Sequence, residues 1–319
     1  MVVLKAFFLG GFQLVVGDRA LEPLPSRRSK ALLAYLMLNP DRAHARELLA
    51  EVIGDAEVTA DPRKTLRQEL WTLRSAFKAG GLDPDGFLST SGEAVTFRTR
   101  EAFWLDAEVF RQEALAAKRS AGAPLTAKAA ERLESAVALY RGELLLGLYD
   151  DWCLYPREVL RDLYLGALER LMLHYQDGRR WDEAITYGKR LLDGDELAEH
   201  VHRDLMRCYY AKGNRAAALR QFEICRELLA RELGVEPMWE TRSLYARIET
   251  EDITLSGAET ASRDRRDAAR PDLKTAIGEL KAANQRISEV IRDIEDGERD
   301  QATPAEHSGR RDGAKKSRR

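Results

Sequence analysis

Residues 61–78 read Asp-Pro-Arg-Lys-Thr-Leu-Arg-Gln-Glu-Leu-Trp-Thr-Leu-Arg-Ser-Ala-Phe-Lys, and they decide how the first half of the chain is interpreted. Asp61 followed by Pro62 is a strong helix start, because aspartate caps free backbone N–H groups and proline fits the first helical position. At about 100° per residue, the apolar side chains fall on one narrow stripe. They are Leu66, Leu70, Leu73 and Phe77. The sequence therefore predicts an amphipathic helix from Pro62 to Lys78.

One flank of this helix is basic and suited to DNA. Between Arg63 and Lys78 there are five basic residues and one acidic residue. Arg and Lys can contact phosphates or donate to guanine, whereas Gln can pair with adenine. The candidate DNA-binding residues on this flank are Lys64, Arg67, Gln68, Trp71, Arg74, Ser75 and Lys78. Taken alone, the same pattern also fits a solvated helix face that binds nothing.

The neighbouring segments favour DNA recognition over a solvated face. We predict β-rich runs at 2–9 and 12–16, helices at 26–38 and 45–53, and a hairpin at 87–100. The helix at 45–53 is expected to bury Leu48, Leu49 and Val52. A sheet, three helices and a hairpin are the order of a winged helix-turn-helix. Contacts to the DNA backbone are expected from Arg27, Arg28, Lys30, Arg98 and Arg100.

The overall composition limits the function without identifying it. The 319 residues suffice for about two domains. Lys and Arg total 51 against 53 Asp and Glu, so any nucleic-acid site must be a local patch. The three cysteines show no metal-ligand or disulfide spacing, and we expect them to be buried and no cofactor to be bound. No signal peptide or membrane-spanning apolar run is evident, so we expect a cytoplasmic protein without membrane contact.

The second half is helical in pattern from Trp104 to Ile248 and contains a weak internal repeat. Tyr175 and Ala184 recur as Tyr209 and Ala218, a spacing of 34 residues. That spacing is the period of a tetratricopeptide helix pair, in which an aromatic and a small residue meet where the helices cross. Turns are expected at Gly178 and Gly213.

Near the C-terminus, an amphipathic segment follows a heptad pattern. Its apolar seam, with one asparagine, is Leu273, Ile277, Leu280, Asn284, Ile287, Ile291 and Ile294. A buried Asn in such a seam favours a parallel dimer in one register, so we predict a homodimer. The alternative is that this helix docks on its own repeat domain.

The predicted fold class is mainly α. It comprises an N-terminal winged helix-turn-helix of the α+β class, an all-α tetratricopeptide-like repeat domain and a C-terminal coiled-coil helix. The expected DNA-binding domain is 1–103 and the repeat domain 104–251. A linker follows at 252–270, the coiled-coil helix at 271–297 and a disordered basic tail at 298–319.

These features resemble the Streptomyces antibiotic regulatory protein (SARP) type of transcriptional activator. Residues 8–14 (Phe-Leu-Gly-Gly-Phe-Gln-Leu) and 27–36 (Arg-Arg-Ser-Lys-Ala-Leu-Leu-Ala-Tyr-Leu) look like its winged helix, which is of the response-regulator kind. Residues 139–145 (Leu-Tyr-Arg-Gly-Glu-Leu-Leu) and 232–237 (Glu-Leu-Gly-Val-Glu-Pro) are similar to the start and the end of its bacterial transcriptional activator domain.

The resemblance implies binding to double-stranded promoter repeats and recruitment of RNA polymerase, with genes of secondary metabolism as the expected targets. Two departures are visible. Residues 52–57 lack the Trp that the family usually has after the second helix. Neither a receiver domain before the winged helix nor an ATPase after it is expected.

No pattern of catalytic residues was found. Residues 202–205 (His-Arg-Asp-Leu) spell part of a kinase catalytic loop, but Tyr209 stands where the magnesium-binding Asn would be. We therefore expect a protein that is not an enzyme. Two alternatives to an activator remain open. One is a repeat-domain scaffold whose winged helix contacts protein, and the other is a repressor using the same DNA contacts.

Overall fold

The computed structural model describes residues 4–21, 24–54, 61–99, 103–120 and 122–250. The predicted linker, coiled-coil seam and basic tail lie outside these residues, as does Arg100. No described helix is both long and apolar enough to cross a membrane.

A four-stranded sheet opens the fold. Its strands lie in the order β3 (Arg19–Ala20), β2 (Gln13–Val16), β1 (Leu4–Phe7) and β7 (Phe103–Leu105). β1 pairs antiparallel with β2, with Leu4 opposite Val16, and parallel with β7. The sequence predicted helix from Trp104 onward. The strand forms instead, because Phe103–Leu105 completes an edge of a sheet whose other strands lie about a hundred residues earlier.

Three helices follow the first three strands of this sheet along the chain, as predicted: α1 (Arg27–Leu38), α2 (Arg46–Ile53) and α3 (Pro62–Ala79). The Ser26 side chain caps α1 by accepting from the Ser29 N–H, and Asp61 caps α3 by accepting from the Lys64 N–H. The predicted apolar stripe of α3 is fully buried. In α2 the prediction is confirmed at Leu49, which is buried, whereas Val52 is only partly buried. It was wrong at Leu48, which is 40% exposed, because the helix turns Ala50 and Ile53 inward.

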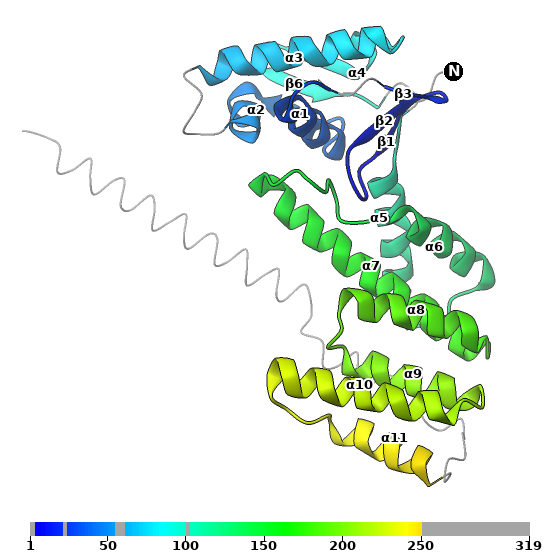
Figure 1. Cartoon of the computed structure of the whole chain (residues 1–319). Helices are drawn as coiled ribbons and strands as arrows, with labels where there is room; N and C mark the ends of the chain where they lie inside the picture. The colour runs from blue at the N-terminus through cyan, green and yellow to red at the C-terminus, as the bar shows by residue number, and fades with distance from the viewer. Residues whose placement is uncertain (1–3, 22–23, 55–60, 100–102, 121, 251–319) are drawn as a thin grey trace, which may run out of the picture. The chain divides into compact units, whose positions relative to one another are not determined.

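The predicted hairpin is present next to α3 (Figure 1). A short helix, α4 (Pro84–Phe87), leads into β5 (Leu88–Ser91), which pairs antiparallel with β6 (Ala94–Phe97). β4 (His44–Ala45) adds a third strand on the other side of β6. Gly92 turns the chain at the hairpin tip with φ +56°, a conformation that favours glycine.

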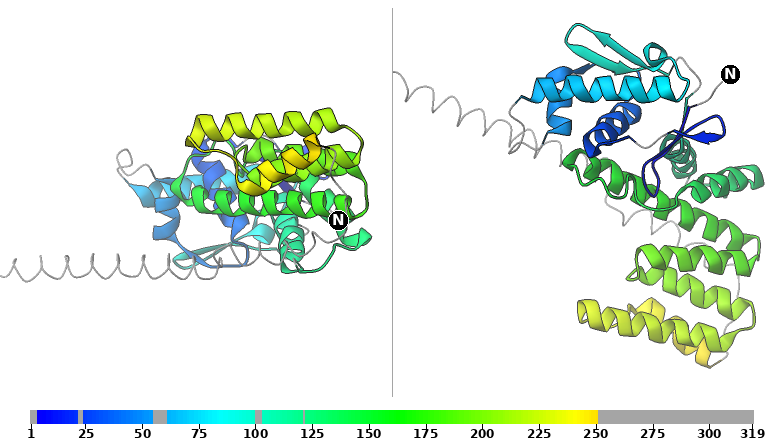
Figure 2. Two further views of the ribbon diagram at one scale, coloured as in Figure 1. Left: turned by 90° about the horizontal axis from the view of Figure 1, so that it is seen from below. Right: turned by 45° about the horizontal axis from the view of Figure 1, so that its top comes forward.

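Seven helices make up the described second half. They are α5 (Asp106–Arg119), α6 (Ala127–Leu139), α7 (Asp151–Asp177), α8 (Trp181–Gly194), α9 (Glu199–Ala211), α10 (Arg215–Leu233) and α11 (Trp239–Glu249). Each helix from α7 to α10 packs on the next, and α11 closes the stack against α9 and α10 (Figure 2).

The packing confirms the helical-repeat prediction. Ala184 and Ala218 are fully buried, and Tyr175 is buried beside α8, where its ring stacks on that of Tyr187. Gly213 lies in a turn with φ +83°. A β-carbon at Gly188 would lie 2.7 Å from Leu205 Cδ2, so the side chains of α9 pack closely on α8 there. All three cysteines are free and buried.

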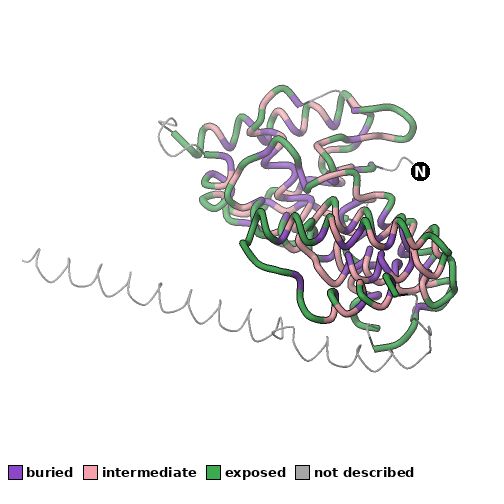
Figure 3. Tube along the Cα trace, turned by 60° about the horizontal axis from the view of Figure 1, so that its bottom comes forward, coloured by how far each residue is buried: buried purple, intermediate pink, exposed green. Residues whose placement is uncertain are grey.

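The winged helix and the repeat half share one core, and buried positions occur throughout both halves (Figure 3). The Leu145 N–H donates to the Phe8 carbonyl at 2.7 Å, and the Gly10 N–H donates to Glu143 at 3.0 Å. A β-carbon on Gly142 would lie 3.1 Å from the Gly10 Cα, so the two backbones are in direct contact. This contact region, residues 8–10 with 142–145, is called the joint below.

Two buried charged side chains reinforce the joint. Asp106 accepts from the backbone N–H groups of Phe8, Leu9 and Ala107 at 2.7–3.0 Å. Burial raises the pKa of the Asp106 carboxyl above its ordinary value, although these donors oppose the rise. Arg157 donates to the carbonyls of Leu144 and Leu148 at 3.0 and 2.8 Å.

Candidate nucleic-acid interface

The basic flank of α3 faces solvent over most of its length. Trp71 is 64% exposed, which is unusual for so large an apolar side chain. The other exposed members are Lys64, Arg67, Gln68, Ser75 and Lys78. Their side-chain polar groups form no hydrogen bond or ion pair with the described residues. They are therefore available to a ligand, and the sequence placed them correctly on one exposed face.

Arg74 differs from its neighbours on this flank. Its guanidinium forms an ion pair with Asp85 of α4 at 2.5 Å and donates to the Leu88 carbonyl at 3.0 Å. These contacts hold α3 against the start of the hairpin. The structure thus gives Arg74 partners within the protein, which the sequence did not reveal because Asp85 lies eleven positions further along.

Glu69 anchors the opposite side of α3. Its carboxylate accepts from the hydroxyl of Ser26 at 3.0 Å and from that of Ser29, both at the first turn of α1. A negative charge at a helix N-terminus is favoured by the free N–H groups there. The sequence showed Glu69 only as one acidic residue on the far flank. In the structure it is buried and ties α3 to the start of α1.

The predicted backbone-contacting residues have different surroundings. Arg27 pairs with Asp150, at the start of α7, at 3.0 Å, although half of its side chain remains exposed. The residues Arg28, Lys30 and Arg98 are partly buried. Arg46, which the sequence did not single out, donates from Nε to the Gly92 carbonyl at 3.3 Å. It therefore adds a cation beside the tip of the hairpin.

The described residues contain no group of three or more His, Cys, Asp or Glu side chains that could hold a metal ion. Burial raises the pKa of each cysteine thiol to about 12. His202 of the kinase-like sequence lies inside α9, where burial lowers its pKa and its ring contacts Glu196 and Gln221.

The exposed flank of α3 offers cations, an amide and an aromatic ring for binding a ligand.

Comparison with known proteins identifies the second half. The bacterial transcriptional activator domain matches residues 105–249. The transcriptional regulatory protein MoaR1 of Mycobacterium tuberculosis is 26% identical over 230 residues, which cover 71% of this chain and 73% of MoaR1. The regulatory protein AfsR of Streptomyces coelicolor is 28% identical over 272 residues, 83% of this chain. The match spans only 27% of AfsR.

A solved structure shows the same fold. Mycobacterium tuberculosis EmbR, determined in complex with a low-affinity phosphopeptide, superposes with a TM-score of 0.65 at 20% identity. The superposition covers 89% of this chain and 71% of EmbR. The likeness therefore extends over both the winged helix and the repeat domain.

Proposed function

We propose that the chain is a transcriptional regulator of the SARP type and that it binds promoter DNA sequence-specifically through α3; its second half matches the bacterial transcriptional activator domain, and it is similar to named transcriptional regulators. The relatives are transcriptional regulators by name, and DNA recognition is the step that such a regulator needs.

The observation that carries the proposal is the contrast between the two sides of α3. One side is buried in the core and tied to α1 through Glu69. The other presents Arg67 and Gln68 at mid-helix without partners among the described residues. In a major groove, Arg67 would donate to guanine and Gln68 would pair with adenine. Lys64 and Lys78, nearer the two ends of the helix, would contact phosphates.

Trp71 and Ser75 complete the proposed contact surface. The Trp71 ring would lie against a sugar or a thymine methyl group, and this contact would explain why so large an apolar side chain is exposed in the free protein. Phosphate contacts from the flanks would come from Arg27, Arg28, Lys30, Arg98 and Arg100.

We propose further that the protein activates transcription by bringing RNA polymerase to the promoter, with the repeat domain as the contact. The expected targets are genes of secondary metabolism and the expected compartment is the cytoplasm. The heptad seam from Leu273 to Ile294 would join two copies, one on each promoter repeat.

The decisive experiment is selection of bound DNA from a random pool by the full chain, followed by anisotropy titrations on the selected site. We expect Arg67→Ala and Gln68→Ala each to weaken binding by roughly tenfold to a hundredfold and to relax preference at one base. Lys64→Ala should weaken binding to all sequences and reduce the salt dependence. Arg226→Ala, an exposed arginine of α10, is the matched control and should have no effect.

A scaffold whose winged helix contacts protein predicts a different outcome. The double variant Arg67→Ala with Gln68→Ala would then retain its function, and no site would emerge from the pool. Transcription with purified polymerase on the selected site separates activator from repressor, because only an activator increases the transcript.

A further inference from the structure

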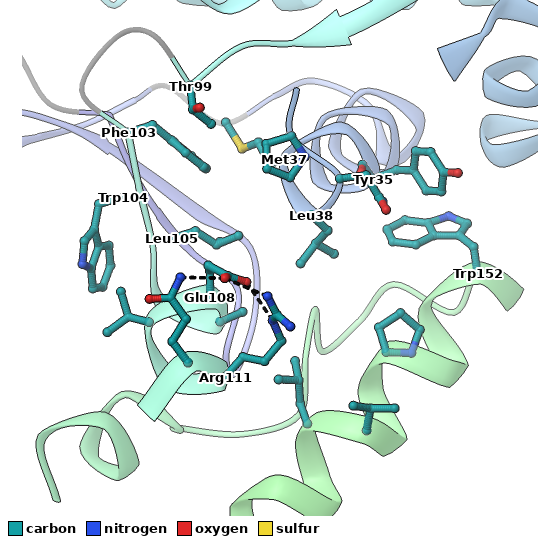
Figure 4. Close-up of a pocket in the computed structure, with 18 of the residues that line it drawn as sticks. Tyr35, Met37, Leu38, Thr99, Phe103, Trp104, Leu105, Glu108, Arg111 and Trp152 are labelled. Atoms are coloured by element: carbon teal, nitrogen blue, oxygen red, sulfur yellow. Dashed lines mark hydrogen bonds and ion pairs between the residues drawn. The ribbon is translucent and has the colours of Figure 1, made fainter. Parts of the chain in front are cut away.

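A crevice of about 630 Å³ lies where the DNA-binding half meets the repeat half (Figure 4). Four parts of the chain line it: the end of α1 and the residues after it, Thr99 after β6, β7 with the first turns of α5, and the N-terminal part of α7. Its volume is within the range of roughly 300–1,000 Å³ that is usual for small-molecule sites. None of the candidate DNA-binding residues lines it.

The walls of this crevice are mainly apolar and aromatic. Phe103 and Trp104 lie on one side, and Trp152 lies on the other beside Tyr35 (Figure 4). The Tyr35 and Trp152 rings meet edge to face, with centroids 5.3 Å apart. Aliphatic lining comes from Met37, Leu38, Leu105, Val109, Val159 and Leu160.

The charged groups of the lining are already paired with each other. Both oxygens of Glu108 accept from the Arg111 guanidinium at 2.8 Å, and Gln112 donates to one of them at 2.8 Å (Figure 4). The two charges of this partly exposed pair offset each other, so the lining presents no net charge to a ligand.

Two neutral polar groups of the lining are engaged as well, whereas the Trp152 indole N–H is buried without a hydrogen-bond partner among the described residues. The Thr99 hydroxyl donates to Asp41, and the Asn39 amide donates to the Tyr35 carbonyl at 2.9 Å. The crevice therefore offers apolar surface without an uncompensated charge. Such a lining selects for neutral molecules that gain from leaving water.

We propose that this crevice is a binding site for a neutral, predominantly apolar small molecule. It is a function separate from DNA binding through α3. The bound molecule would touch α1, which packs against α3, and α7, which belongs to the repeat half. It would thus contribute contacts to both halves at once, and its binding would stabilise the folded chain.

The test uses Nile red, a neutral planar dye whose emission shifts to shorter wavelength in apolar surroundings, with the full chain and no DNA. We expect saturable binding to one site. Val159→Trp, which places a bulky ring in the crevice, and Leu38→Asn, which places an amide on its wall, should each weaken binding by roughly tenfold. Circular dichroism and melting temperature verify that each variant is folded.

The matched control is Trp239→Ser, which removes a large exposed aromatic ring on α11 far from the crevice lining. It should leave the Nile red affinity unchanged. Binding that survives both crevice variants, binding that is lost in Trp239→Ser, or no saturable binding at all would overturn the proposal. An anionic anilinonaphthalene sulfonate dye should not displace Nile red, and displacement would contradict the requirement for a neutral ligand. Failure of DNA binding leaves each of these outcomes unaffected.

Discussion

The outward flank of α3 and the joint between the two halves belong to one compact unit, yet they use polar groups in opposite ways. On the flank, Arg67 and Gln68 have no partner among the described residues. At the joint, Gly10 and Gly142 bring two backbones together, and Asp106 accepts three N–H groups. A surface that binds a ligand keeps its hydrogen-bond donors free, whereas a surface that holds two domains in a fixed arrangement pairs its donors within the protein. Substitutions of the free residues on the flank should therefore lower DNA affinity, whereas substitutions at the joint should lower the free energy of unfolding.

The largest effect is expected at Asp106. Asp106→Ala leaves the N–H groups of Phe8, Leu9 and Ala107 without their acceptor, and we expect a loss of about 3–5 kcal/mol in the free energy of unfolding. Urea denaturation of the full chain measures it. Asp106→Asn, which retains one carbonyl acceptor, should lose less. A loss below about 1 kcal/mol for the alanine variant would mean that Asp106 does not hold the joint.

The backbone contact at Gly142 is the next test. Gly142→Ala places a methyl group 3.1 Å from the Gly10 Cα, and we expect a cost of about 1–3 kcal/mol. Gly166→Ala is the control, because a β-carbon there meets nothing within 4 Å. In the interior of α7 that change should stabilise by about 0.5–1 kcal/mol. Equal effects of the two substitutions on the midpoint of urea unfolding would show that the backbones at Gly10 and Gly142 do not pack tightly against each other.

Two arginines of the same flank sharpen the comparison further. Arg74→Ala breaks the contacts with Asp85 and the Leu88 carbonyl, one of them partly buried, and should cost about 1 kcal/mol of stability. Arg67→Ala should change stability by less than about 0.5 kcal/mol, because it breaks no contact with the described residues. Melting temperature and DNA affinity are measured on both. A stability loss in the Arg67 variant equal to that in the Arg74 variant would contradict the distinction.

The parts of the fold that the sequence predicted are those set by local signals. The caps at Ser26 and Asp61, the buried stripe of α3 and the turn at Gly92 each depend on residues a few positions apart. What it missed depends on distant partners. The strand β7 forms only because β1 is there to pair with it.

The candidate interface follows the same rule. The exposed members of the flank were placed correctly by helical periodicity, and no observation yet tests whether they bind DNA. The roles of Glu69 and Arg74 were not predictable, because their partners come from α1 and from the segment leading into the hairpin. The crevice was also missed, since its walls come from residues more than a hundred positions apart.

The smallest expected effect is the pH dependence of stability that His202 contributes from the interior of the repeat half. His202 is buried, and burial lowers its pKa. Its Nε2 lies 3.0 Å from the Glu196 carbonyl and its Nδ1 lies 2.7 Å from the Gln221 amide nitrogen, an arrangement that fits the neutral ring. The folded protein then binds fewer protons than the unfolded chain, whose histidine has a pKa of about 6.5. Stability should be independent of this group above that pH and should fall as the pH drops below it, until the pKa of the folded state is reached.

The slope that this group contributes cannot exceed about 1.4 kcal/mol per pH unit. Removing the titrating ring by His202→Gln lowers stability at neutral pH but should flatten the dependence between pH 6.5 and 5. Groups that are present in both proteins contribute equally to both curves. The difference between the two unfolding curves therefore isolates His202. A difference that stays constant over this range would show that His202 accepts a proton equally well in the folded and the unfolded chain.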